Sequence, residues 1–369
     1  MRTGALILGV LACAGGVSVP AAGAPIVDLG ELPALGPRIS ASGEVFGALH
    51  ADGVAPRLVR WGSPLSEAEQ LATPGWLAPT RLAIGADGVL VLAAWDTREA
   101  WRERPYLYRA DAGLVELPHE GKFAGEVSLP AIAMGADGLV YGFGRLESED
   151  QPVVYGSADE LPLPVASPMT GGRVESGFVD AGGGLVMSVS VDGVGPARTM
   201  RLDGEQWTDL GDPSASGEDG WLVARACEPG GVMVGGGASS LGGAMEPALV
   251  SPEGAIESLG LLDGWIGAEA LAVSGSGWVV GEATVFDEAM FDLRGQAFAW
   301  HESVGLVELS GEDGWTLLSA TGISDDGWVV GIGVLDGVER AYAMRIPSAP
   351  GALVLGLGAM ALCRRRRSV

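Results

Sequence analysis

The sequence contains few of the side chains that catalysis, metal binding or nucleic-acid binding usually require. Its 369 residues include only three cysteines and three histidines, and Lys122 is its only lysine. Nucleic acids are bound through stripes of basic side chains, so a formal net charge of -25 argues against a nucleic-acid partner. The 47% hydrophobic content and the 60 glycines indicate a folded chain with many turns rather than a disordered one.

The few cysteines and histidines are also dispersed. Cys13 and Cys363 lie near the two ends of the chain, which leaves Cys227 alone in the body and excludes a disulfide there. Because its neighbours are mostly apolar, Cys227 is predicted to be a buried small residue rather than a nucleophile. The histidines fall in separate segments without metal-ligand spacing, which argues against a zinc site. They are His50, His119 and His301.

The N-terminal segment, residues 1–24, resembles a secretory signal. One basic residue precedes an apolar run that ends in Ala22-Gly23-Ala24, the small-x-small pattern of a cleavage site. Val10-Leu11-Ala12-Cys13 also resembles a lipobox, and in that alternative Cys13 would carry a lipid. Both interpretations predict export.

The C-terminal segment, residues 348–369, resembles a PEP-CTERM sorting signal. A proline-containing spacer precedes uncharged residues 351–363, which as a helix would cover roughly 20 Å of a hydrocarbon core roughly 30 Å thick. The resemblance implies exosortase-type sorting machinery as a partner, membrane contact before processing, and a cell-surface, outer-membrane or extracellular location in a Gram-negative-type bacterium. The spacer departs from the usual Pro-Glu-Pro, and a weak tail anchor is the alternative. The signal residues are Pro347, Pro350, Arg364, Arg365, Arg366 and Arg367.

A phrase centred on a turn glycine recurs throughout the body of the chain, residues 25–347. Its clearest copies read AVSGSGWVVGEA at 272–283 and GISDDGWVVGIG at 322–333. Seven copies occur at intervals of 45 to 50 residues, a periodicity that indicates a repeat architecture. The turn glycines are Gly43, Gly88, Gly138, Gly184, Gly231, Gly277 and Gly327.

Each copy predicts four short strands. Apolar runs on both sides of the glycine predict a hairpin with a tight primed turn. Two more alternating segments follow in most copies, as in AFAWH at 297–301 and GLVELS at 305–310. Four-stranded units of roughly 40 to 50 residues are typical of propeller blades. The sequence therefore predicts an all-β fold, a seven-bladed β-propeller of four-stranded blades.

The last copy lacks a fourth strand, and the N-terminal segment matches the missing piece. The copy ends after AYAMRI at 341–346, whereas Ile26 to Leu32 resembles the fourth strand of the other copies. We therefore expect this segment to form the outer strand of the blade that contains Trp328. Closure of this kind removes the exposed strand edges of an open array.

These phrases resemble the extracellular HAF-repeat family. Its unit pairs Ile-x-x-x-Gly-x-Val-Val-Gly with His-Ala-Phe-x-Trp, and the best matches here are GISDDGWVVG and GQAFAWHESVGLVEL, with Gln296 in place of the histidine. The likeness covers nearly all of the body. It implies a secreted, propeller-like fold and supplies no catalytic residues.

The two ends of such a propeller differ. One end, which we call the loop face, carries the connections between blades and those between second and third strands; the glycine turns lie on the opposite end, the hairpin face. Variable segments at 93–105, 144–152 and 282–296 fall on the loop face, so we expect ligand binding there.

Tryptophans beside carboxylates also fall on the loop face. They could stack on a sugar ring while an acid accepts hydroxyl hydrogen bonds. Their recurrence at one place in the repeat instead favours indoles wedged between blades and acids in solvated turns. The candidate ligand-face residues are Trp221, Asp219, Trp265, Trp315 and Asp313.

No cofactor or catalytic centre is predicted. GEDG and SDDG offer carboxylates for calcium but lack the Asp-x-Asp-x-Asp-Gly spacing, and neither a Gly-x-Ser-x-Gly elbow nor a P-loop occurs. Carboxylate pairs brought together from distant loops leave glycoside cleavage open. The sequence favours a non-catalytic binding or structural protein of the envelope or extracellular matrix, with a polysaccharide or protein ligand. The alternative is a hydrolase or lyase acting on extracellular polysaccharide.

Overall fold

A computed structural model describes residues 19–20, 25–31 and most of 35–346. Within the last range, the residues outside the description are 52–53, 85–88, 97, 99–101, 118–130, 135–139, 147–148, 156–162, 165–171, 181–183, 192–197, 204–205, 211–220, 229, 239–242, 253 and 288–290.

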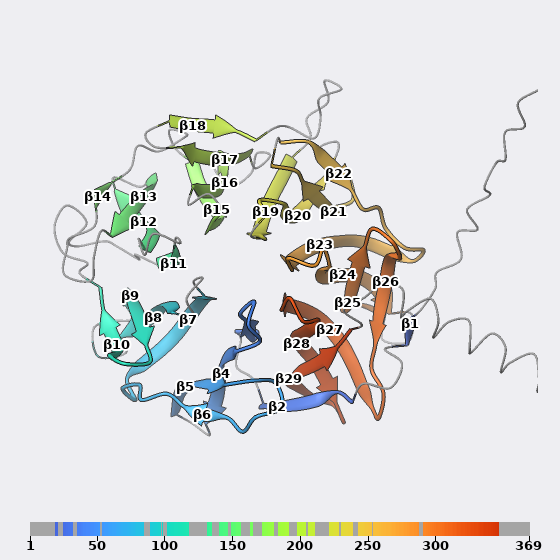
Figure 1. Ribbon diagram of the computed structural model, residues 1–369, viewed down its shortest axis with the longest axis horizontal. Coiled ribbons are helices and arrows are strands. Elements are labelled where there is room, and N and C mark those ends of the chain that lie inside the picture. The colour runs from blue at the N-terminus through green and yellow to red at the C-terminus, as the bar shows by residue number, and fades with distance from the viewer. Residues whose placement is uncertain are drawn as a thin grey trace, which may run out of the picture.

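The chain is an all-β propeller whose sheets are arranged around a common centre (Figure 1). The first strand of each repeat lies nearest the centre and later strands lie further out (Figure 1). The first four sheets contain β3 (Arg38–Ile39), β4 (Val45–Ala51), β5 (Val54–Trp61) and β6 (Glu69–Gln70); β7 (Leu77–Ile84), β8 (Leu90–Asp96), β9 (Arg102–Arg109) and β10 (Gly113–Glu116); β11 (Ala131–Met134), β12 (Val140–Leu146), β13 (Glu149–Tyr155) and β14 (Leu163–Pro164); β15 (Gly172–Val179), β16 (Leu185–Val191), β17 (Arg198–Asp203) and β18 (Gln206–Asp209). The others contain β19 (Trp221–Cys227), β20 (Met233–Ala238), β21 (Glu246–Val250) and β22 (Ile256–Ser258); β23 (Trp265–Val273), β24 (Val279–Asp287), β25 (Asp292–His301) and β26 (Gly305–Ser310), joined by β1 (Val19–Pro20); and β27 (Trp315–Ile323), β28 (Trp328–Leu335) and β29 (Val338–Arg345), joined by β2 (Val27–Glu31).

The sequence-based count of seven four-stranded blades is wrong. Counted over the described residues, six sheets have four strands, and the remaining sheet has five because β1 pairs in parallel with β26, placing Val19 opposite Leu309. Residues 19–20 fall in the segment assigned to the signal, outside the repeat. A two-residue strand shows no alternation, and its Pro20 is tolerated because β1 lies at a sheet edge. The sequence pattern therefore contains no sign of this strand.

The predicted N-terminal closure is confirmed. Strand β2 pairs antiparallel with β29, in the sheet whose order is β2-β29-β28-β27 and whose β28 contains Trp328. Leu29 of β2 is only 5% exposed, and it packs in a core that combines Val45 of the first blade with Val330 of the last. The two ends of the body are thus held in one sheet, which closes the ring (Figure 1).

The glycine that ends each Gly-Trp-Val-Val-Gly phrase makes room for an aromatic ring. Gly281 lies directly opposite Phe298, and Gly331 lies directly opposite Tyr342, in the ladders between second and third strands. A Cβ at Gly331 would lie 2.0 Å from the Ser319 carbonyl oxygen and 2.7 Å from the Tyr342 ring. No other residue fits such a close approach, so the repeated glycine is a packing requirement.

The turns on the hairpin face differ from the primed turn predicted for them. Ser324 and Trp328 form the last hydrogen-bonded pair, which leaves a three-residue loop. Only its third residue, Gly327, has a positive φ, +87°. This is the type I turn with a glycine bulge, rather than a primed turn. The same glycine position has positive φ at Gly43, Gly231 and Gly277.

A primed turn does occur, but on the loop face. Asp336 and Gly337 both have positive φ, 51° and 82°, and connect β28 to β29 through the pair Leu335–Val338. Two positive φ angles in a two-residue connection define a type I′ turn. An Asp-Gly pair thus forms a primed turn at 336–337 but not at 326–327, where the loop contains one more residue.

Candidate functional site

Exposed apolar side chains gather on the loop face. Seven large hydrophobic residues are exposed among the described residues, and six of them lie at loop-face ends of strands or in loop-face connections. The exception is Leu65, in the β5–β6 connection on the hairpin face. The six are Trp95, Ile266, Phe286, Phe291, Leu293 and Val338.

Four of the six belong to one blade, at the tip of the hairpin formed by β24 and β25. Phe286 lies opposite Leu293 in the ladder, and its ring meets that of Phe291 edge-on with centroids 5.4 Å apart. Ile266 stands in a bulge of the adjacent strand β23, beside the same end of the sheet. Phe291 is 85% exposed and has φ 54°, an uncommon angle for an aromatic residue. We call these four residues the apolar tip.

The segments expected to be long variable loops are largely strands. Within 282–296, β24 continues to Asp287 and β25 starts at Asp292. Within 93–105, β8 continues to Asp96 and β9 starts at Arg102. Hydrogen bonds between paired strands therefore support both segments, and the apolar tip stands on a regular hairpin instead of a free loop.

The tryptophans proposed as sugar platforms are occupied by protein contacts where their side chains are described. Trp265 is 7% exposed, its ring centroid lies 5.4 Å from that of Phe298, and its Nε1 donates a hydrogen bond to Glu308 at 3.1 Å. Trp315 is 9% exposed and meets the Tyr342 ring edge-on at 6.1 Å. Both indoles contribute to packing within and between blades.

Of the remaining residues predicted for function, only Asp313 has a described side chain. Asp313 is exposed, with φ 53°, in the turn before β27. Trp221 starts β19, but its side chain and Asp219 lie outside the described residues. So do the sorting-signal residues Pro347, Pro350 and Arg364 to Arg367, and the predicted apolar segment at 351–363. In the described part of the chain, no helix has the length and apolarity needed to cross a membrane.

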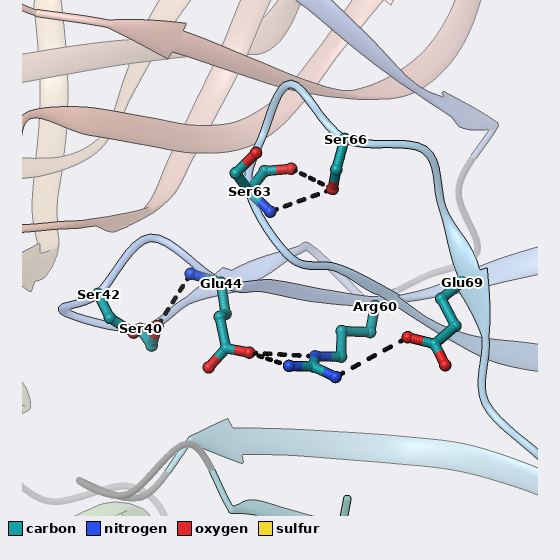
Figure 2. A network of polar contacts seen from close by, with 7 residues as sticks. All are labelled: Ser40, Ser42, Glu44, Arg60, Ser63, Ser66 and Glu69. Carbon is teal, nitrogen blue, oxygen red and sulfur yellow. Dashed lines mark hydrogen bonds and ion pairs between the residues drawn. The ribbon is translucent and has the colours of Figure 1, made fainter.

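The hairpin face, in contrast, carries polar groups that bind one another. In the first blade Arg60 of β5 pairs with Glu44 beside the glycine turn and with Glu69 of β6, 3.8 Å away (Figure 2). The Ser66 hydroxyl donates to the Ser63 carbonyl at 2.8 Å, which fixes the neighbouring connection (Figure 2). These side chains stabilise turns and join strands, which leaves them little capacity to bind a ligand.

The acidic residues considered for calcium also have structural partners. In SDDG, Asp325 Oδ1 accepts a hydrogen bond from the backbone of Gly275 in the neighbouring blade at 2.7 Å, and Asp326 Oδ1 accepts one from Ser324 at 2.6 Å. Among the described residues, no group of three or more His, Cys, Asp or Glu side chains is placed to hold a metal ion.

A second polar group, which the sequence did not reveal, lies on inner strands and on the adjacent strand β24. Arg225 of β19 contacts both carboxylate oxygens of Glu269 of β23, at 2.6 and 3.4 Å. Glu269 lies directly opposite Glu282 of β24, and Glu282 hydrogen-bonds Ser319 of β27. Burial raises the pKa of Glu282, the negative charge of Glu269 raises it further, and the Ser319 hydrogen bond opposes the shift. We call these four residues the inner cluster, and we include Arg38 of β3 because the positive charge of Arg225 acts on its guanidinium.

The inner cluster left only a weak trace in the sequence. Arg225, Glu269 and Glu282 each interrupt a largely apolar strand, and Glu282 stands where the matching phrase has Ile332. Charged residues in apolar strands are unusual unless they are paired, and this was the available signal. Which of them meet could not be read from one sequence, because they come from four different blades.

No protein-family model matches the chain, and no curated protein is significantly similar to it. Solved structures with a similar fold include a streptogramin B lyase (TM-score 0.55, 14% identity, 86% of this chain and 95% of that chain). Others are a puromycin hydrolase (TM-score 0.57, 15% identity, 87% and 52%) and prolyl oligopeptidase B from Galerina marginata (TM-score 0.55, 10% identity, 81% and 46%).

These similarities establish the β-propeller fold. At 10 to 15% identity they do not show that this chain shares an activity or a substrate with those proteins. The chain also spans only about half the length of the hydrolase and oligopeptidase chains. Function therefore has to be argued from the chain's own surfaces.

Proposed function

We propose that the protein is an exported, non-catalytic binding protein of the cell surface or extracellular matrix, which holds a polysaccharide or an envelope protein on its loop face. The observation that carries this proposal is that six of the seven large apolar residues found exposed in the described part of the chain lie on that face. Solvent-exposed clusters of large apolar side chains mark sites of interaction. The polar groups described on the hairpin face bind one another and offer no comparable surface.

The apolar tip is suited to a ligand that presents a flat apolar face. Phe286 and Phe291 combine ring surface with a regular hairpin beneath them, so little side-chain or backbone freedom is lost on binding. Sugar rings and apolar patches on envelope proteins both offer such faces. The signal-like and PEP-CTERM-like ends, together with the HAF-type repeat, support an extracellular site of action.

A propeller-fold hydrolase or lyase acting on extracellular polysaccharide is the alternative function. The observation that favours it is the Glu269–Glu282 pair, whose members have different surroundings: Glu269 is paired with Arg225, whereas burial raises the pKa of Glu282. A pair of carboxyl groups in different surroundings is the usual arrangement for acid and base roles.

An array of extracellular glycans and envelope proteins, probed with the full-length chain, tests the proposal. We expect retention on a restricted set of ligands, and a glycan ligand should be recovered with its chain length unchanged. Release of reducing ends or unsaturated products by the wild-type chain, abolished in Glu282→Gln, would contradict the binding function and support the alternative. Failure to retain any ligand would contradict both.

A further inference from the structure

We propose that Arg38 forms a binding subsite for a single carboxylate group at the centre of the ring, separate from the loop face and independent of the function proposed for it. Arg38 belongs to β3, an inner strand, and its Nη1 donates a hydrogen bond to the Thr321 carbonyl of the adjacent inner strand at 2.9 Å. This bond fixes the guanidinium in place, although the residue is accessible to solvent.

The charges of the inner cluster leave Arg38 as its uncompensated cation. Arg225 is neutralised by Glu269, and Glu282 is directed toward Ser319. No carboxylate of the described residues forms an ion pair with Arg38. The surrounding strands and the positive charge of Arg225 lower the pKa of its guanidinium. An arginine nevertheless stays protonated, so its positive charge has no ion-pair partner among the described residues.

The chemistry of the site selects a carboxylate among possible anions. The planar guanidinium retains further N–H donors that match the two oxygens of a carboxylate, and such charge-assisted contacts are strong in partly desolvated surroundings. A single arginine supplies one positive charge, which balances the single negative charge of a carboxylate but only half that of a doubly charged phosphate.

Calorimetric titration of the full-length chain with sodium glucuronate, sodium acetate and glucose at matched ionic strength tests the subsite. We expect glucuronate to bind and glucose not to bind. Equal affinity for acetate would show that the carboxylate alone is recognised, whereas weaker acetate binding would show that sugar hydroxyls contribute; both results support the subsite. Failure of both carboxylates to bind, or binding of glucose as tight as that of glucuronate, would overturn it.

Substitutions at Arg38, compared with a control substitution in the same blade, test whether this residue binds the carboxylate. Arg38→Gln should weaken glucuronate binding at least about tenfold, and Arg38→Lys, which keeps the charge but loses the planar fork, should weaken it less. The control is Arg57→Gln, which removes a cation from the same blade at an exposed position where Arg57 donates to Gln70 at 3.2 Å. If Arg38→Gln does not fold, Arg38→Lys decides. Unchanged affinity in the folded Arg38 variants would overturn the proposal.

Discussion

Closure of the ring by β2 can be tested through a single side chain. Leu29 lies at the middle of β2, and Leu29→Ala would leave a cavity in the core shared by the first and last blades. Burial at 5% exposure predicts a loss of unfolding free energy in the range of about 2–5 kcal/mol. We expect about 2–3 kcal/mol, the lower part of that range, because β2 is a short outer strand whose surroundings can relax.

Calorimetry provides a suitable readout. An unfolding entropy of roughly 2.1 cal/mol/K per residue, over the roughly 320 residues of the body, converts that loss into a decrease in Tm of about 3–5 °C. Leu65→Ala is the control, because Leu65 is 70% exposed and its truncation should cost less than about 0.5 kcal/mol. If both variants melt at the same temperature, β2 does not contribute to a common core and the closure argument fails.

Two further predictions concern packing and pH. Gly331→Ala would place a Cβ 2.0 Å from the Ser319 carbonyl oxygen and should destabilise the fold by at least about 1–3 kcal/mol in urea unfolding, whereas Gly75→Ala, with no atom within 4 Å, should be nearly neutral. Asp96 is fully buried and paired with Arg98 at 2.8 Å, and the Arg98 hydrogen bond lowers its pKa. Because its pKa is lower in the folded state than the unfolded value of about 3.9, ionised Asp96 stabilises the fold above that pH, and this stabilisation is lost as the pH falls through the folded pKa. The wild-type Tm should therefore fall more steeply below about pH 4 than that of Asp96→Asn. If the Tm of the wild type and that of Asp96→Asn fall in parallel as the pH is lowered, ionised Asp96 does not stabilise the fold.

The repeat and its closure could be predicted from the sequence because local signals carry them. Turn glycines, strand alternation and the fourth strand missing near Ile346 are all visible within segments of about ten residues. The fifth strand of one sheet was missed because Val19–Pro20 pairs with a strand almost three hundred residues away and has no pattern of its own. The turn type was wrong because the loop length, not the Asp-Gly dipeptide, selects it.

The candidate sites were less predictable. The loop face was chosen because variable segments fall on it, and the structure adds that the apolar tip stands there on a regular hairpin. The inner cluster depends on side chains from separate blades, such as Arg225 and Glu269, which are 44 residues apart. Pairing over that distance depends on how the blades pack, which a single sequence does not specify.

The most direct test of the account is the affinity of Phe291→Asn for a ligand found on the array. Asparagine tolerates the positive φ of 54° at this position, so the substitution removes the ring while preserving the turn. Leu65→Asn on the hairpin face is the matched control. Binding through the loop face predicts that Phe291→Asn raises Kd at least about tenfold, roughly 1.4 kcal/mol, while Leu65→Asn leaves it unchanged. Equal affinity of both variants and the wild type, or a loss confined to Leu65→Asn, would contradict it.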